Sequence, residues 1–289
     1  MQPQLNKKSI RRNFDRAADS YDASAVLQRE VAARLLERLD YIRAVPKTIL
    51  DVGAGTGFIG AGLRQRYKQS QIIELDLSVR MLQKIRNKSP WYKRLFNTPP
   101  LLCADAEQLP LKDNSVDMIF SSLAIQWVND LQNTFAEFMR VLRPGGLVMF
   151  TTFGPDTLKE LRQSWQQVDS HDHVNSFIDM HDIGDSMLAC RFAEPVMDVE
   201  NIVLTYESVS GLMQDLKDIG ATNASEQRQR GLTSKSAYQA MTDAYESMRV
   251  DGKLPATYEV VYGHAWKAEA KETSAEVEVE FNGKDINLN

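Results

Sequence analysis

Glycines at alternate positions follow an acidic residue in the segment TILDVGAGTGFIG, residues 48–60. Apolar residues lead into Asp51, and a helical apolar pattern begins at Ile59. This order predicts a buried strand over 48–52, a tight turn, and a helix over 57–68. Glycine is needed where a Cβ would collide with a turning backbone or a close ligand. The free N–H groups of the helix's first turn then face that ligand.

Asp51 indicates the charge of the expected ligand. The string Gly55–Gly60 matches the dinucleotide fingerprint G-x-G-x-x-G, although a strand–turn–helix without a ligand stays open. The residue before the glycines is usually apolar in pyrophosphate-binding loops, because an anion there would repel phosphate. A carboxylate suits a cationic ligand instead. S-adenosylmethionine (AdoMet) carries an ammonium and a sulfonium and no phosphate, so we expect AdoMet here.

Three more polar residues stand at the ends of predicted strands. Asp76 ends the strand 71–76, Asp105 follows the strand 101–104, and Ser121 lies in the strand 115–122. Asp76 lies about 20 residues beyond the glycines, the separation at which a carboxylate meets the ribose hydroxyls, although a solvated strand-end aspartate stays open. Strands that alternate with helices predict a doubly wound, mostly parallel α/β sheet. Ligands on such sheets lie at the carboxyl ends of the strands, so we expect a single site there.

The composition is that of an ordinary soluble protein. The chain has 289 residues, 43% hydrophobic and 25% charged, with a net charge of −5, so no overall field favours nucleic acid. The two cysteines form no disulfide framework, which indicates a reducing compartment. The N-terminal segment lacks an apolar signal-peptide core, and no apolar run approaches the roughly 20 residues that span a bilayer. We therefore expect a cytoplasmic monomer that binds neither membrane nor nucleic acid.

Four regions follow from the pattern along the chain. Residues 1–45 are expected to form an N-terminal lid and a helix (23–43), and 46–155 an AdoMet-binding core. Within that core, a turn over 143–146 separates a helix over 131–142 from a strand over 147–153. Residues 156–268 are expected to add helical insertions and the last two strands, 196–206 and 258–266. The charged tail 269–289 reads as disordered or as a further strand.

Five motifs, in order, resemble those of class I AdoMet-dependent methyltransferases: Leu50–Gly57, Leu75–Leu82, Ala104–Pro110, Val116–Ile119 and Leu142–Gly146. The resemblance implies a Rossmann-like sheet of seven strands whose last strand is antiparallel. It also implies that the glycines line the methionine part of AdoMet, that Asp76 binds the ribose, and that Asp105 accepts from the adenine amino group. The residues expected to bind the cofactor are Tyr21, Asp51, Gly53, Gly55, Gly57, Asp76, Leu77, Asp105, Ala106, Ser121, Leu123 and Gln126.

A narrower resemblance lies outside the glycine loop. The segments are Phe14–Asp22, Thr152–Arg162, His173–Phe177, Met180–Asp185 and Leu204–Tyr206. They resemble the branch of the family that methylates the free carboxylate of a malonyl thioester on acyl carrier protein in biotin synthesis. Some of them also resemble an AdoMet-fold, arginine-hydroxylating assembly factor of respiratory complex I. A non-catalytic AdoMet-binding protein is the third reading that stays open.

The implied reaction needs no general base and no metal, so we name neither. A carboxylate with a reference pKa of about 4 is already ionised at neutral pH, and alignment alone can supply about 7–11 kcal/mol. The histidines near 171–181 are therefore not read as metal ligands. The basic run 84–94, or Lys159 with Arg162, is expected to dock an acidic carrier, with a solvated face as the alternative. The residues expected to bind the substrate are Arg11, Arg12, Trp127, Arg162, His181 and Arg191.

Overall fold

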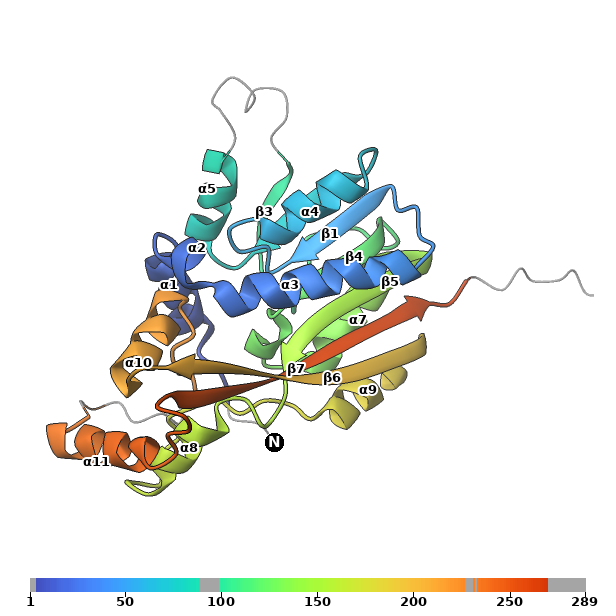
Figure 1. Cartoon of the computed structure of the whole chain (residues 1–289). Coiled ribbons are helices and arrows are strands. Elements are labelled where there is room, and N and C mark those ends of the chain that lie inside the picture. The colour runs from blue at the N-terminus through green and yellow to red at the C-terminus, as the bar shows by residue number, and fades with distance from the viewer. Residues whose placement is uncertain (1–3, 89–98, 227–230, 232, 270–289) are drawn as a thin grey trace, which may run out of the picture.

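A computed structural model describes residues 4–88, 99–226, 231 and 233–269 (Figure 1). The strands are β1 Thr48–Val52, β2 Gln71–Asp76, β3 Leu101–Cys103, β4 Val116–Ser122, β5 Leu142–Phe153, β6 Phe192–Tyr206 and β7 Leu254–Lys267. The helices are α1 Lys7–Ala17, α2 Tyr21–Ser24, α3 Val26–Arg38, α4 Phe58–Arg66, α5 Val79–Lys88, α7 Leu131–Val141, α8 Lys159–Gln166, α9 Met180–Ala189, α10 Val209–Asp218 and α11 Lys235–Glu246. The short 3-10 helices are η1 Leu39–Tyr41 and η2 Ile125–Trp127.

The strands form one seven-stranded sheet in the order β3-β2-β1-β4-β5-β7-β6. The pairs among β1 to β5 are parallel, and β7 is antiparallel to both of its neighbours. The predicted fold class, a doubly wound and mostly parallel α/β sheet, is confirmed. The central strands are continuous apolar runs because both faces of the sheet are covered.

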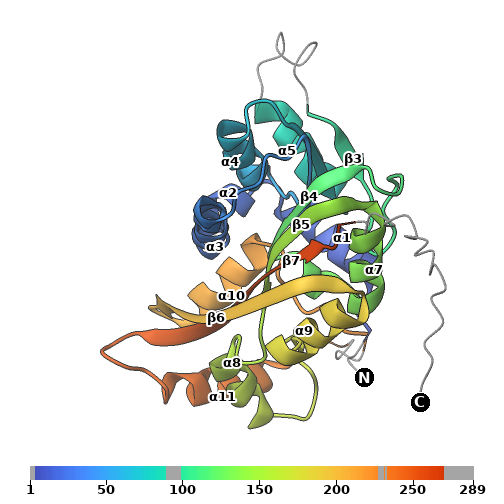
Figure 2. The same cartoon turned by 90° about the vertical axis from the view of Figure 1, so that its right-hand side faces the viewer.

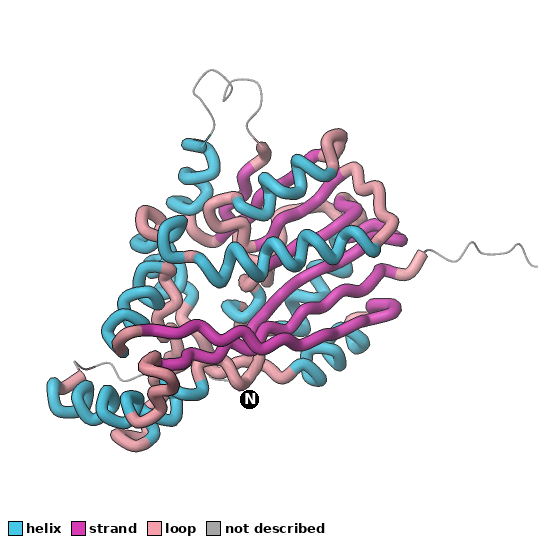
Figure 3. The backbone as a smooth tube through the Cα atoms, viewed as in Figure 1, coloured by secondary structure: helices cyan, strands magenta, loops and turns pink. Residues whose placement is uncertain are grey.

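Helices cover the two faces of the sheet unequally (Figures 1 and 2). One apolar cluster joins α3, α4, α8, α10 and α11 to one face, and a second joins α7 and α9 to the other. Figure 3 shows α3 running across the front of the strands. The first cluster spans residues from Ala25 to Tyr262, so the N-terminal helices and the region after residue 155 share one core with the central strands.

Some predicted boundaries were wrong. The segment 143–146 is not a separate turn, because β5 begins at Leu142 and carries an irregularity where Val116 pairs with Leu142 but Met118 pairs with Leu147. Gly145, with φ of 74°, supplies the left-handed residue of that irregularity. The sequence pattern also predicts a helical segment around 180–192, but α9 ends at Ala189, and Arg191 beyond it has φ of 64°.

Helices α1 and α2 were not expected from their mostly polar sequence. Residues 270–289 of the predicted tail lie outside the described residues. The four-region division itself stays a prediction.

Candidate functional site

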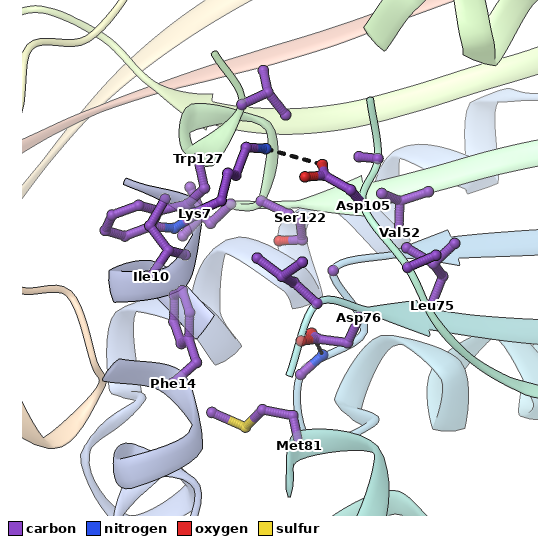
Figure 4. A pocket seen from close by; sticks show the side chains of 18 of the residues that line it. Lys7, Ile10, Phe14, Val52, Leu75, Asp76, Met81, Asp105, Ser122 and Trp127 are labelled. Atoms are coloured by element: carbon purple, nitrogen blue, oxygen red, sulfur yellow. Dashed lines mark hydrogen bonds and ion pairs between the residues drawn. The ribbon is translucent and has the colours of Figure 1, made fainter. Parts of the chain in front are cut away.

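A cleft of about 670 Å³ opens at the carboxyl ends of the parallel strands (Figure 4). Strand ends supply one wall, with Val52, Asp76 and Ser122, and helix α1 supplies the opposite wall with Lys7, Ile10 and Phe14. The full lining is Lys7, Ile10, Phe14, Tyr21, Val52, Gly53, Gly55, Leu75, Asp76, Leu77, Met81, Ala104, Asp105, Ala106, Ser122, Leu123, Ala124, Trp127 and Val128. Of the strand-end residues expected to meet at one site, Asp76 and Asp105 line this cleft.

The glycine turn forms the floor of the cleft. The Gly53 and Ala54 N–H groups donate to the Leu75 carbonyl at 2.8 and 2.9 Å, which fixes the turn to β2. Gly53 has φ of 74°, and a Cβ on it would lie 2.2 Å from the Cβ of Ala124. A side chain at this position would therefore be strained and would also push against Ala124, just after β4.

Asp76 is held by backbone donors from both sides of the cleft floor. Its Oδ2 accepts from the Gly55 N–H at 2.8 Å, and its Oδ1 accepts from the Ser78 N–H at 2.7 Å. Burial raises the pKa of Asp76 to about 6, although both hydrogen bonds favour the ionised form. Each oxygen keeps a lone pair that can accept from a ligand hydroxyl.

Asp105 lies at the other end of the cleft, where it is paired with helix α1. Its Oδ1 accepts from Lys7 Nζ at 2.9 Å and from the Glu107 N–H at 3.1 Å (Figure 4). Lys7 also pairs with Glu107. Only Oδ1 is used in these contacts, so Oδ2 is left to accept from a ligand. The ion pairs of Lys7 therefore connect α1 to the segment after β3, on the other side of the cleft.

Tyr21 separates the cleft from a second compartment of about 780 Å³ on the other side of the glycine turn. Gly53, Gly55 and Ser122 line both spaces, and Gln28 and Lys88 line the second compartment but not the cleft. Burial, with the neighbouring Asp76 and Asp22, raises the pKa of Tyr21, so its hydroxyl stays protonated. Tyr21, which was predicted to bind the cofactor, therefore borders both spaces.

Two residues predicted to contact the cofactor lie beneath the cleft instead. Asp51 is 1% exposed and lines neither compartment, and neither of its carboxylate oxygens makes a hydrogen bond of normal geometry among the described residues. Burial first, and then Glu74 and Asp76, raise its pKa, which Arg64 and the Gly60 N–H offset only in part. Gly57 caps α4 with φ of 86° and faces Ile85. The left-handed backbone at the start of α4, rather than contact with a ligand, explains why residue 57 is a glycine.

Ser121 and Gln126 are also misplaced in the prediction. The Ser121 Oγ is fully buried and donates to the Val52 carbonyl at 3.0 Å, while its neighbour Ser122 lines the cleft. Side chains alternate along a strand, so only the second of these two adjacent serines faces the cleft. Gln126 donates to the Leu123 carbonyl at 2.7 Å and lines a smaller cavity of about 290 Å³.

Trp127 marks the junction between the cleft and a third cavity of about 860 Å³. That cavity is lined by Gln28, Trp127, Phe153, Thr157, Leu158, Leu161, His173, Val174, Asn175, Phe177, Met213, Leu216, Ile219, Ala221, Thr222, Asn223 and Tyr258. We refer to it as the acyl cavity. Its wall is mostly apolar, with a few hydrogen-bonding groups, as small-molecule sites usually are.

The other residues predicted to bind the substrate do not line the acyl cavity. Arg162 donates to the Pro155 and Thr157 carbonyls at 2.8 and 3.1 Å, beside the cavity wall. Arg11 and Arg12 are exposed on α1, and Arg191 is exposed beyond the end of α9. His181 points to solvent and bonds to Asp179 at 2.8 Å. None of these five residues lines the cleft or the acyl cavity.

The His173 side chain was not predicted to bind the substrate, although its segment was singled out. Its ring stacks on Trp165 at 3.7 Å and 7°, and Nε2 bonds to Asp169 at 2.9 and 3.1 Å. Over the described ranges, no group of three or more histidine, cysteine or acidic residues is arranged to hold a metal ion. His173 is therefore a wall residue of the acyl cavity held by its own neighbours.

Lys7, Ile10 and Phe14 were missed as site residues. A signal for them existed, because Ile10, Phe14 and Ala17 are spaced by four and three residues, as on one face of a helix. Phe14 also packs edge-on against Trp127 at 5.4 Å. Helix α1 therefore reaches Trp127, at the junction between the cleft and the acyl cavity.

A family model described as "Methyltransferase domain" matches residues 50–150. The chain is 55% identical to the malonyl-[acyl-carrier protein] O-methyltransferase of Gallionella capsiferriformans over 265 residues, 91% of each chain. It is 53% identical to the enzyme of that name from a Methylovorus species, over 92% of this chain and 91% of the relative.

The chain belongs to the malonyl-[acyl-carrier protein] O-methyltransferase family. Solved structures agree on the fold. YcgJ from Bacillus subtilis has a TM-score of 0.58 at 14% identity and covers 82% of this chain and 100% of its own. A phosphoethanolamine N-methyltransferase of Haemonchus contortus in complex with S-adenosyl-L-methionine has a TM-score of 0.53 at 18% identity. The match covers 88% of this chain and 57% of the Haemonchus contortus chain.

The protein is an AdoMet-dependent methyltransferase, as the motifs predicted. AdoMet fits the cleft: the turn carries no Cβ where it meets the ligand, and Asp76 and Asp105 supply acceptors at the two ends. Helices that are both long and apolar enough to cross a bilayer are absent from the described part of the chain.

Proposed function

We propose that this protein transfers the methyl group of AdoMet to the free carboxylate of a malonyl group carried by acyl carrier protein. The observation that carries the proposal is the match to relatives of that name along nine-tenths of both chains. In the reaction a carboxylate oxygen forms a bond to the methyl carbon as the sulfur–methyl bond breaks. The products are the methyl ester and S-adenosylhomocysteine, and no proton is transferred.

The cleft residues hold the methyl donor. In this proposal Asp76 accepts from the ribose hydroxyls, Asp105 Oδ2 accepts from the adenine amino group, and Ala106 N–H meets a ring nitrogen. Gly53 and Gly55 lie along the methionine part, beside Tyr21. AdoMet supplies an activated methyl group, so the chain contributes alignment rather than acid or base chemistry.

The acyl cavity receives the malonyl thioester. Trp127 belongs to both spaces, so a carboxylate beside it is close to the methyl group in the cleft. The apolar wall excludes water, which also keeps the nucleophilic carboxylate poorly solvated. Arg162 is bound to two carbonyls and lies beside the wall, so it is not free to pair tightly with the carboxylate and blunt its reactivity.

The methyl ester has lost the charge of the free carboxylate. In biotin synthesis this masking allows fatty-acid synthesis to extend the acyl chain. We place the protein in the cytoplasm as a monomer.

The test is to incubate the purified protein with AdoMet and malonyl-carrier protein, and to measure the mass of the carrier. The expected product is the carrier with one added methylene mass, formed together with an equal amount of S-adenosylhomocysteine. Acetyl-carrier protein has no free carboxylate and should stay unchanged. Malonyl-coenzyme A as a parallel substrate shows whether the carrier is needed.

Two other results would reject the proposal. An AdoMet-binding protein without turnover would retain AdoMet and leave every thioester unmodified. An assembly factor that hydroxylates arginine would likewise leave malonyl-carrier protein unmethylated.

A further inference from the structure

Helix α1 carries a cationic stripe on its solvent face. Lys8, Arg12 and Arg16 follow one another at intervals of four residues, Arg11 lies three residues after Lys8, and all four side chains are exposed. On the described part of the chain, none of the four pairs with an acidic side chain. The stripe stands on a protein whose net charge is −5.

The basic residues of α5 differ from this stripe. Arg80 and Lys84 both pair with Asp19, at 2.9 and 2.5 Å, and Lys88 pairs with Asp22 at 2.9 Å. Lys84 and Lys88 of the run 84–94 therefore already have acidic partners in the N-terminal segment, whereas Arg86 is exposed, and the docking of a carrier by this run stays a prediction. Lys93 and Arg94 lie outside the described residues.

The stripe stands directly over the two spaces that the reaction uses. The inner face of α1 places Ile10 and Phe14 against the cofactor cleft. Asn13 donates to the Thr222 hydroxyl at 2.6 Å, and Gly220 packs against Phe14. Thr222 lines the acyl cavity. A macromolecule bound to the outer face of α1 is therefore adjacent to the acyl cavity.

We propose that Lys8, Arg11, Arg12 and Arg16 form the docking surface for the acidic carrier protein, and this rests on the proposed function. Acyl carrier proteins are acidic, so the charges of the two surfaces are complementary. The carrier's pantetheine arm would enter beside α1 and place the malonyl group next to Trp127. Complementary charge of this kind raises the rate of encounter and weakens with salt.

The experiment uses the full chain with the double charge reversal Arg12→Glu/Arg16→Glu. The expected result is a KM for malonyl-carrier protein raised about tenfold, with kcat and AdoMet affinity unchanged. Turnover of malonyl-pantetheine, the arm without its protein, should be unchanged. The matched control is Arg43→Glu/Lys68→Glu, which makes the same change in net charge at exposed positions before β1 and β2, at the opposite end of the sheet. The control should keep the wild-type KM.

Binding of the carrier without an acyl group gives a second readout. The dissociation constant, from fluorescence anisotropy, should rise with salt for wild type and control and should be higher and less salt-dependent for the α1 variant. An unchanged KM and dissociation constant in the α1 variant would overturn the proposal. An equal loss with malonyl-pantetheine would also overturn it, because α1 would then act on the cleft alone. Absence of methyl transfer by the wild type to either thioester would instead reject the proposed function.

Discussion

The cofactor cleft and the acyl cavity meet at Trp127 but have different walls. The cleft takes most of its lining from four short segments that end or follow β1 to β4, together with α1. The acyl cavity takes its lining from α3, α8, the loop 173–177, α10 with its following loop, and β7. Backbone hydrogen bonds fix the shape of the cleft, and side-chain packing fixes the shape of the acyl cavity. Substitutions in the cleft should therefore change AdoMet affinity steeply, whereas those in the acyl cavity should change acyl selectivity.

The largest effect is expected for Gly53→Ala. The left-handed φ costs about 1–2 kcal/mol, and contact with Ala124 adds about 1–3 kcal/mol of overpacking. The free energy of unfolding should fall by that sum, and the AdoMet dissociation constant should rise by more than about 100-fold. Denaturant unfolding measures the free energy of unfolding, and calorimetric titration measures the AdoMet dissociation constant. Gly252→Ala is the control, because Gly252 has φ of 75° and nothing within 4 Å of an added Cβ. Equal losses of stability in both variants would show that the Ala124 contact is unimportant.

Asp76→Asn should weaken AdoMet binding by about 100-fold, because hydrogen bonds to a charged acceptor contribute about 1.5–3 kcal/mol each. The control is Asp117→Asn, since Asp117 accepts from the Lys47 and Thr48 N–H groups at 2.8 and 2.7 Å at the other end of the sheet. That variant should lose stability but keep its AdoMet affinity. Calorimetric titration decides, and similar dissociation constants for the two variants would contradict the ribose role of Asp76.

The same carboxylate predicts how AdoMet binding depends on pH. Burial raises the pKa of Asp76 to about 6, so the carboxylate takes up a proton as the pH falls through that value. The protonated form is the poorer acceptor, so the AdoMet dissociation constant should rise below pH 6 and be constant above it. Asp76→Asn should lack this dependence. A flat profile for the wild type would assign the ribose to another acceptor.

Ala221→Leu tests the acyl cavity alone. The added carbons enter a space that Ala221 lines, so kcat/KM for malonyl-carrier protein should fall about tenfold. AdoMet affinity should not change, because Ala221 does not line the cleft. Ala240→Leu, on the exposed side of α11, is the control. Steady-state kinetics give the answer, and a matching loss of AdoMet affinity would mean that the two spaces are not separable.

The smallest effect is expected for Lys7→Met. Lys7 pairs with Asp105 across the cleft, and its side chain is 23% exposed, so the pair should contribute about 0–1 kcal/mol. The AdoMet dissociation constant should rise about threefold, and less at high salt. As a control, Lys253→Met breaks the surface ion pair with Glu207, whose two residues do not line the cleft. This variant should keep the wild-type AdoMet dissociation constant. A rise of more than tenfold in the AdoMet dissociation constant would mean that the Lys7–Asp105 ion pair contributes more to AdoMet binding than a surface ion pair does.

The sheet, the glycine turn and Asp76 could be predicted because their signals are local. Glycine spacing, strand-end acids and alternating elements each depend on a few adjacent residues. The same local reasoning could not separate Ser121 from Ser122, because the orientation of a strand residue depends on the register with its neighbours. It also placed Asp51 in the cleft, although this residue is buried and does not line the cleft.

The acyl cavity could not be predicted for a different reason. Gln28, Asn175, Ala221 and Tyr258 come together only through the packing of distant segments. No spacing in the sequence marks them as neighbours. The arginines chosen by charge alone proved to be surface residues or to bind backbone carbonyls, because a charge pattern says nothing about which face of an element is buried.

A crystal structure of the protein with S-adenosylhomocysteine and a malonyl-pantetheine tests the account most directly. The account predicts the ribose on Asp76, the sulfur facing Trp127, and the malonyl carboxylate beside that sulfur with its thioester in the acyl cavity. A sulfur facing away from Trp127, or a malonyl group bound outside the cavity lined by Phe177 and Tyr258, would contradict it.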